Sequence, residues 1–101
     1  MNTLKFYHIL HNYAVYDRTS MYSFNSKTIL REESFGAVVS MGTNEFYVTV
    51  PVFKLLCIFR DWGTFGHKDL ESVVIVNPML EKLLSQWISA GIIYTVSGDS
   101  T

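Results

Sequence analysis

Residues 35–50, with the sequence FGAVVSMGTNEFYVTV, decide the fold that we expect for this chain. Two runs rich in β-branched and aromatic residues, 35–41 and 45–50, are separated by Gly42-Thr43-Asn44. This triplet tolerates the positive φ that a tight hairpin turn demands. The stretch therefore predicts a β-hairpin, preceded by a short strand over 28–31 that turns into it at Glu33-Ser34.

Side chains alternate along the second strand of this hairpin. One set is apolar and is expected to face the core: Phe46, Val48 and Val50. The other set is amphipathic and is expected to be open to solvent: Glu45, Tyr47 and Thr49.

Three helices are predicted after the sheet. Pro51 suits a first helical turn, and the apolar spacing that follows predicts a helix to about residue 61 or 62. A second helix is expected over 68–75, with Leu70, Val73 and Val74 inward, although its β-branched run disfavours a helix. The inward face of the first helix carries Val52, Leu55, Leu56 and Phe59.

The third helix has the clearest boundaries. Asn77 is a good N-cap, Pro78 suits the first turn, and Gly91 suits the left-handed position beyond the helix end. Residues 92–96 return to β-like composition. The apolar residues at helical spacing are Leu80, Leu83, Leu84, Trp87 and Ile88.

The order of elements predicts an α+β domain, a three-stranded antiparallel sheet followed by three helices. Residues 1–20 fit two interpretations, and we treat them as an N-terminal extension before a domain at 21–96, with a flexible tail at 97–101. Tyr13 to Tyr16 would suit a strand. A helical stripe is formed by Phe6, Ile9, Leu10 and Tyr13.

Length and charge exclude several classes of protein. The 101 residues suffice for one domain. A formal net charge of −1 leaves little attraction for nucleic acid phosphates. No apolar run approaches the roughly 20 residues that span a bilayer, and no signal sequence is recognisable. We therefore expect a soluble, cytoplasmic protein that binds neither nucleic acid nor membrane.

Catalytic and metal-binding chemistry has few candidates. His8 and His11 share a helical spacing but lack a third ligand, and Cys57, the only cysteine, is expected to be a buried, inert thiol. His67 is expected at the N-terminal edge of the second helix, where it would cap that helix. Glu32 and Glu33 are adjacent, which sends them to opposite faces of a strand. We expect no catalytic residue, no metal and no cofactor.

Residues 29–39, ILREESFGAVV, resemble the signature region of PqqD-like recognition elements, especially the accessory protein of mycofactocin maturation. The resemblance continues through the hairpin, the helix from Val52 and the closing stretch from Leu83 to Ile93, and it covers roughly residues 22–96. It implies a winged-helix-like fold. It also implies a peptide chaperone that binds the leader of a ribosomally synthesised precursor and presents it to a maturase, often a radical SAM enzyme, without performing chemistry.

In that family the leader adds a strand beside the third strand and packs against the third helix. Lys82 is then a steering charge for an acidic leader, with Tyr47 and Met79 as adaptable apolar contacts. The competing interpretation is that Lys82 is solvated and Tyr47 covers its neighbouring strand. The peptide-binding residues implied by the resemblance are Glu45, Phe46, Tyr47, Val48, Thr49, Val50, Met79, Lys82, Leu83 and Gln86.

Two other functions are compatible with the same order of elements. A winged-helix DNA-binding regulator would read the major groove with the third helix, but that helix carries Lys82 as its only cation. A non-catalytic structural subunit would stabilise a modifying enzyme through its aromatic surface. The sequence indicates neither the precursor peptide nor the oligomeric state.

Overall fold

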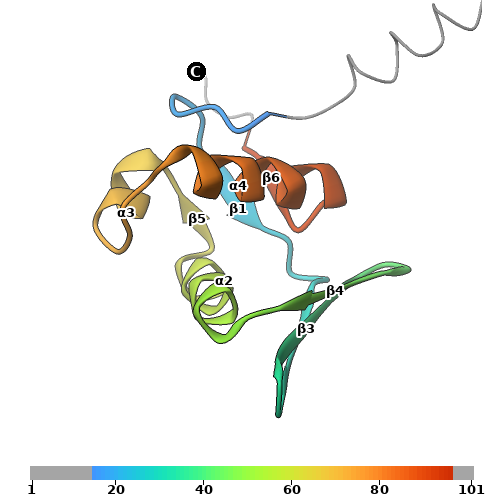
Figure 1. Cartoon of the computed structure of the whole chain (residues 1–101). Coiled ribbons are helices and arrows are strands. Elements are labelled where there is room, and N and C mark those ends of the chain that lie inside the picture. The colour runs from blue at the N-terminus through green and yellow to red at the C-terminus, as the bar shows by residue number, and fades with distance from the viewer. Residues whose placement is uncertain (1–14, 97–101) are drawn as a thin grey trace, which may run out of the picture.

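The computed structural model describes residues 15–96 and leaves residues 1–14 and 97–101 undescribed. The pair His8 and His11, and the tail predicted at 97–101, therefore lie outside the described residues. The described chain is a small α+β domain with two antiparallel sheets of three strands each and three helices. Figure 1 shows the helices grouped together, with a β-hairpin extending away from them.

The first sheet is the predicted one, and its strands run β2 (Ile29–Glu33), β3 (Gly36–Met41) and β4 (Asn44–Val48) in the order of the sequence. Leu30, Val39 and Phe46 lie opposite one another across the three strands. The hairpin is confirmed, with Gly42 at φ +62° in the turn. The strand expected at 28–31 lies one to two residues later, and its turn falls at residues 34–35.

The end of β4 corrects one expectation. Thr49 and Val50 were expected in the strand, but Thr49 is the N-cap of α2 (Val50–Trp62) and Val50 is the first helical residue. Pro51 explains this boundary, because its fixed φ and missing N–H suit a first helical turn and cannot continue a sheet ladder. Val50 is consequently 45% exposed and does not face the core.

The second helix is shorter than expected. α3 spans His67–Glu71, and the β-branched run at 73–76 is a connection rather than a helix. Leu70 is fully buried, as predicted, while Val73 is 42% exposed and so does not point inward. Consecutive β-branched side chains lose rotamer freedom in a helix, which explains the early end of α3.

The third helix, α4 (Pro78–Ala90), has the predicted boundaries. The side-chain oxygen of Asn77 accepts a hydrogen bond from the N–H of Leu80 at 2.8 Å, and Gly91 adopts φ +84°. Both ends are therefore fixed by local chemistry.

A second sheet was not expected from the sequence. Its central strand is β1 (Tyr22–Phe24), which pairs antiparallel with β5 (Thr64–Phe65) on one side and β6 (Ile93–Thr95) on the other. The extended segment predicted near the C-terminus is confirmed as β6. This sheet joins the beginning, middle and end of the described chain.

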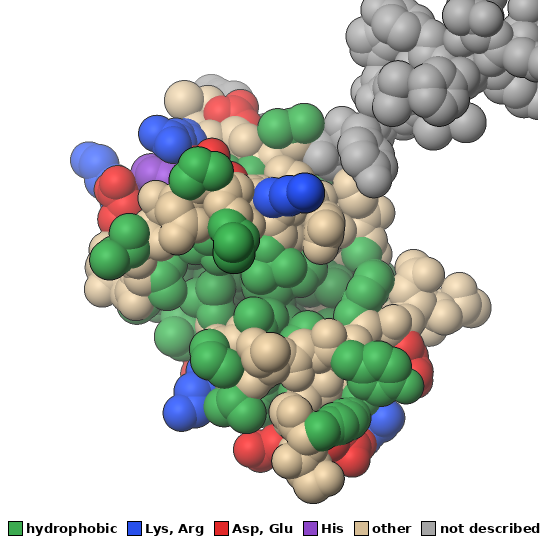
Figure 2. Space-filling view, viewed as in Figure 1, with side chains coloured by type: hydrophobic (Ala, Val, Ile, Leu, Met, Phe, Trp, Pro, Cys, Tyr) green, Lys and Arg blue, Asp and Glu red, His purple; other side chains and the backbone are tan. Residues whose placement is uncertain are grey.

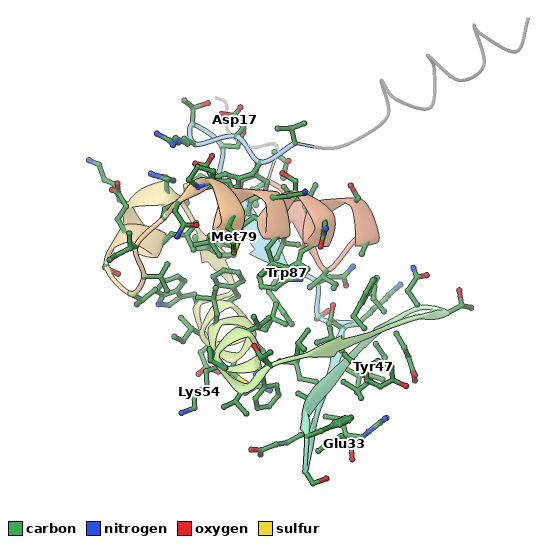
Figure 3. All side chains as sticks on the ribbon, viewed as in Figure 1. Asp17, Glu33, Tyr47, Lys54, Met79 and Trp87 are labelled. Carbon is green, nitrogen blue, oxygen red and sulfur yellow. The ribbon has the colours of Figure 1, made fainter. Side chains whose placement is uncertain are left out.

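The core lies between α2, α4 and this second sheet. The rings of Phe59 and Phe65 stack with their centroids 4.3 Å apart, and Trp87 meets Phe59 edge-on at 5.9 Å. Figure 3 shows Trp87 directed from α4 toward α2. These contacts set the relative positions of α2 and α4. Replacing a buried aromatic residue such as Phe59 with Ala costs about 3–5 kcal/mol of stability.

Candidate peptide-binding groove

β4 presents a free backbone edge. Within residues 15–96, β4 pairs with β3 on one side and with no strand on the other. Met41 pairs with Asn44 around a two-residue loop, so the N–H of Asn44 points toward β3. N–H groups alternate along an antiparallel strand, and those of Glu45 and Tyr47 therefore point to the open side. This edge can accept a further strand.

The helix α4 faces this edge with a polar side. Leu84 and Trp87 are buried against the core and hold the helix in place. The residues on the outward side then follow at helical spacing. They are Met79, Lys82, Gln86 and Ser89, all exposed.

A groove separates α4 from β4. It has a volume of about 590 Å³ and a largely apolar lining in which Phe46 is 37% exposed. Figure 2 shows hydrophobic side chains gathered in the hollow between the upper and lower halves of the molecule. The residues that line the groove are Val15, Asn44, Phe46, Lys82, Ser85, Gln86, Ser89 and Ala90.

A second hollow of about 560 Å³ lies against the N-terminal half of α4. It shares Lys82 and Gln86 with the groove, so the two depressions meet at these side chains. Met79, 81% exposed, is part of its apolar wall. The other lining residues are Asn77, Leu80 and Leu83.

The structure brings together half of the residues expected in the site. Five of them line the groove or the adjoining hollow: Phe46, Met79, Lys82, Leu83 and Gln86. The remaining five do not. Val48 is half-buried and packs against the core. Thr49 and Val50 belong to the start of α2. Glu45 and Tyr47 lie on the opposite face of β4, so they adjoin the site through their backbone alone.

The side chain of Tyr47 lies away from the groove, although the resemblance implied that it contacts the leader. Tyr47 is 77% exposed, and its ring meets the ring of Phe35 edge-on, with 5.6 Å between the centroids. Phe35 precedes β3 and is itself 59% exposed. This aromatic pair therefore forms part of an open face of the first sheet, on the side away from α2.

Sequence reasoning missed five of the residues that line the groove, and Asn77 and Leu80 of the adjoining hollow. Ser85, Ser89 and Ala90 lie three to eight residues from Lys82, and helical spacing carries enough information to find them. Asn44 is recognisable once β4 is known to begin there. Val15 has no signal in the sequence, because its place depends on contacts made by the residue after it.

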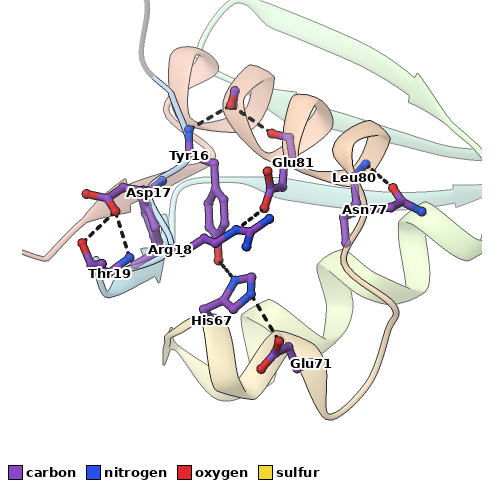
Figure 4. Close-up of polar contacts among 11 residues, drawn as sticks. Tyr16, Asp17, Arg18, Thr19, His67, Glu71, Asn77, Leu80 and Glu81 are labelled. Atoms are coloured by element: carbon purple, nitrogen blue, oxygen red, sulfur yellow. Dashed lines mark hydrogen bonds and ion pairs between the residues drawn. The ribbon is translucent and has the colours of Figure 1, made fainter.

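That next residue, Tyr16, starts a strap over residues 16–18 that fastens the chain to α3 and α4 (Figure 4). The N–H of Tyr16 donates to Ser85 Oγ at 2.9 Å, and its hydroxyl lies 2.8 Å from His67 Nδ1. Arg18 Nε donates to Glu81 Oε2 at 2.7 Å. The strap thereby holds Val15 at the groove.

Burial makes the hydroxyl of Tyr16 a weaker acid than an exposed tyrosine. Its side chain is 8% exposed, and this burial, with the neighbouring Tyr22 and Glu81, raises the pKa of Tyr16 to about 12. Desolvation disfavours the phenolate, which is the charged form. The neutral hydroxyl is thus available for its contact with His67 over most of the pH range.

Among residues 15–96, one positively charged side chain lines the groove. Four ion pairs occur within residues 15–96, and Lys82 belongs to none of them. Glu81, the next residue, is already paired with Arg18. The ammonium group of Lys82 is therefore accessible to a negatively charged ligand at the meeting point of the two hollows.

The one histidine of the described chain, His67, is the first residue of α3 and Gly66 is its N-cap, so the expected capping by His67 is wrong. Its Nε2 lies 3.5 Å from Glu71 Oε2. No group of three metal-binding side chains occurs within the described range, and Cys57 is half-buried on α2.

Comparison with known protein families, curated proteins and solved structures finds no match to this chain. Over residues 15–96, none of the helices has the length and apolar character needed to cross a membrane.

Proposed function

We propose that this chain binds the leader of a ribosomally synthesised precursor peptide and presents it to a maturase, of the radical SAM class. The observation that carries the proposal is the edge of β4 that no strand within residues 15–96 pairs with, and this edge forms one wall of an apolar groove closed on the other side by α4. An extended peptide entering this groove satisfies the backbone groups of the edge and becomes a fourth strand.

The arrangement of elements supports the same proposal. The order β2-β3-β4 followed by α2, α3 and α4, with the short strand β5 between α2 and α3, supports the proposal of a winged-helix-like domain of the PqqD type. In such a domain, α4 is the helix that meets the incoming peptide. The second sheet is then an addition that ties the N-terminal strand β1 to the helical part.

The groove sets the side-chain pattern of the ligand. Side chains of an added strand alternate, so every second one enters the groove beside Phe46 and Ala90. The others lie on the open face beside Tyr47. Main-chain hydrogen bonds would supply much of the affinity, and the groove would fix the register.

Lys82 favours an acidic leader. It is exposed at the junction of the two hollows and has no ionic partner among residues 15–96. A carboxylate of the leader within reach of Lys82 gains attraction that steers association and weakens with salt. The chain acts as a binding module in this proposal, and the modification is performed by the maturase.

The observations favour peptide binding over DNA binding. The outward side of α4, which would enter a major groove, carries Lys82 as its single cation, next to Glu81. Sequence-specific DNA binding draws on several phosphate contacts from basic side chains. The apolar lining of the groove suits a peptide better than a phosphate backbone.

A titration tests the proposal. Fluorescein-labelled peptides are synthesised from the N-terminal halves of the short reading frames that neighbour the gene, and a labelled DNA duplex from the same locus is used alongside. Fluorescence anisotropy is measured with the full chain, with and without the neighbouring maturase. We expect at least one peptide to bind with saturation and the duplex not to bind. Binding of the duplex without any peptide would refute the proposal.

A further inference from the structure

The beginning of the described chain lies in the groove itself. Val15 is 73% exposed and lines the groove together with Ser85. The hydrogen bond from the N–H of Tyr16 to Ser85 Oγ fixes this position, and the pair of Arg18 with Glu81 secures the strap. Residues 1–14 are joined to the rest of the chain through the peptide bond to Val15. Their point of attachment is thus at the groove wall.

The sequence of this segment has an apolar stripe that needs a partner. Its members recur at the spacing i, i+3, i+4 and i+7, which places them on one side of a helix. An amphipathic segment of this kind buries its stripe in an apolar groove. Of the described residues, Phe46, Ala90 and Met79 offer such a surface beside the tether. The stripe consists of Phe6, Ile9, Leu10 and Tyr13.

We propose that residues 1–14 dock through this stripe in the groove between α4 and β4, and that a leader peptide has to displace them. The docking rests on the position of Val15 and on the apolar stripe in the sequence of residues 1–14, and the displacement rests on the proposed function. The segment carries Lys5 and no acidic residue, and Lys5 lies off the stripe, so it is not forced against Lys82. An intramolecular occupant would keep the apolar groove covered until a leader arrives.

Tethering decides how strongly such a segment competes. A short linker gives an effective concentration of about 1 mM. A segment whose own dissociation constant is about 0.1 mM would then occupy the groove roughly ten times more often than it leaves it free. The apparent affinity of a leader falls by that same factor of about ten, because only the free fraction is competent to bind.

Thiol protection tests the docking without any leader. In the full chain with Cys57→Ser, a single cysteine is placed at Gln86→Cys, which lines the groove, and its reaction with Ellman's reagent is timed. We expect the reaction to be about tenfold faster when the stripe is disrupted by Phe6→Ser and Leu10→Ser. Off-stripe changes, His8→Ser and Asn12→Ser, should leave the rate unchanged.

A cysteine at an exposed position of α3, Lys68→Cys, serves as the control for general reactivity. Its rate should be the same with every version of the segment. Equal rates at Gln86→Cys with intact and disrupted stripes would overturn the proposal. Protection that grows with protein concentration would also overturn it, because a second copy would then be the occupant.

Displacement is measured separately with the labelled peptides of the proposed function. The variant with Phe6→Ser and Leu10→Ser should bind them about tenfold more tightly than the unaltered chain. Equal affinities would contradict competition and so overturn the proposal. Protection at Gln86→Cys with no peptide bound by any variant would instead leave the docking established and refute leader recognition.

Discussion

At the scale of single residues, Gly36 shows how one backbone position shapes the first sheet. It adopts φ +148°, where side chains are strained, and a Cβ there would overlap the carbonyl oxygen of Val48. Gly42 in the other turn has φ +62° and open space around it. The two glycines therefore differ in what a methyl group would meet.

We expect Gly36→Ala to lower the free energy of unfolding by about 2–3 kcal/mol, because backbone strain is joined by a clash with β4. Gly42→Ala should cost about 1 kcal/mol, because it suffers only the strain of a positive φ. Urea denaturation of both variants measures the difference. Equal losses would show that the contact with Val48 adds nothing.

Tyr16 predicts an alkaline limit to stability. Its pKa is raised from 10.0 to about 12, so between these values the folded state holds a proton that the unfolded state loses. Its contribution is complete below pH 10 and disappears as the pH rises toward 12, with a total of about 2–3 kcal/mol.

Substitution separates this effect from general alkaline unfolding. Tyr16→Phe should remove the part of the pH dependence that belongs to this hydroxyl, and should cost about 1 kcal/mol at neutral pH through the lost contact with His67. Tyr94→Phe, at a residue that is 49% exposed, is the matched control. Urea denaturation at pH 7, 10 and 11.5 provides the measurement, and identical pH profiles for the two variants would contradict the role of Tyr16.

At the scale of elements, the direction of two N–H groups on β4 leads to a test of strand addition. Tyr47→Pro removes an N–H that points to the open edge, so the fold should persist while peptide affinity falls by tenfold or more. Phe46→Pro removes an N–H directed at β3 and should instead destabilise the sheet. Circular dichroism reports folding and anisotropy reports binding. Unchanged affinity in folded Tyr47→Pro would place the peptide elsewhere.

Elements with strong local signals could be predicted from the sequence. The N-cap Asn77, the proline after it and Gly91 define α4, and the hairpin follows from its turn. The outward side of α4 could be predicted for the same reason. These features depend on neighbours in the sequence, where capping and periodicity act.

Short strands with distant partners could not be predicted. β1 has three residues and β5 has two, too few for a periodic pattern. Tyr22 pairs with Phe65 and Thr95, and nothing near Tyr22 in the sequence indicates either partner. The same holds for Val15, whose position in the groove depends on the contact between Tyr16 and Ser85.

At the scale of the whole molecule, the two sheets should differ in stability. The N–H of Phe24 donates to the carbonyl oxygen of Gly63 at 2.8 Å within the core, whereas the hairpin extends away from the helices (Figure 1). We expect the amide of Phe24 to exchange with solvent only on global unfolding, and those of Glu45 and Tyr47 to exchange almost unprotected.

Hydrogen exchange followed by NMR tests this difference. Addition of a peptide that forms a fourth strand should slow exchange at Glu45 and Tyr47, because their N–H groups become hydrogen-bonded. The amide of Phe46, already directed at β3, should change less. Strong protection of Glu45 and Tyr47 in the free chain would mean that the edge of β4 is already covered.

The central position of β1 has a consequence for biosynthesis. Its two neighbours, β5 and β6, lie about 40 and 70 residues later in the chain, and the fully buried Ile92 and Ile93 are among the last described residues. A nascent chain on the ribosome therefore cannot close this sheet until β6 has emerged from the exit tunnel. The local hairpin β3–β4 can form much earlier, because its loop is short. A translational pause before residue 92 would hold the chain with its hairpin formed and its core still open to chaperones.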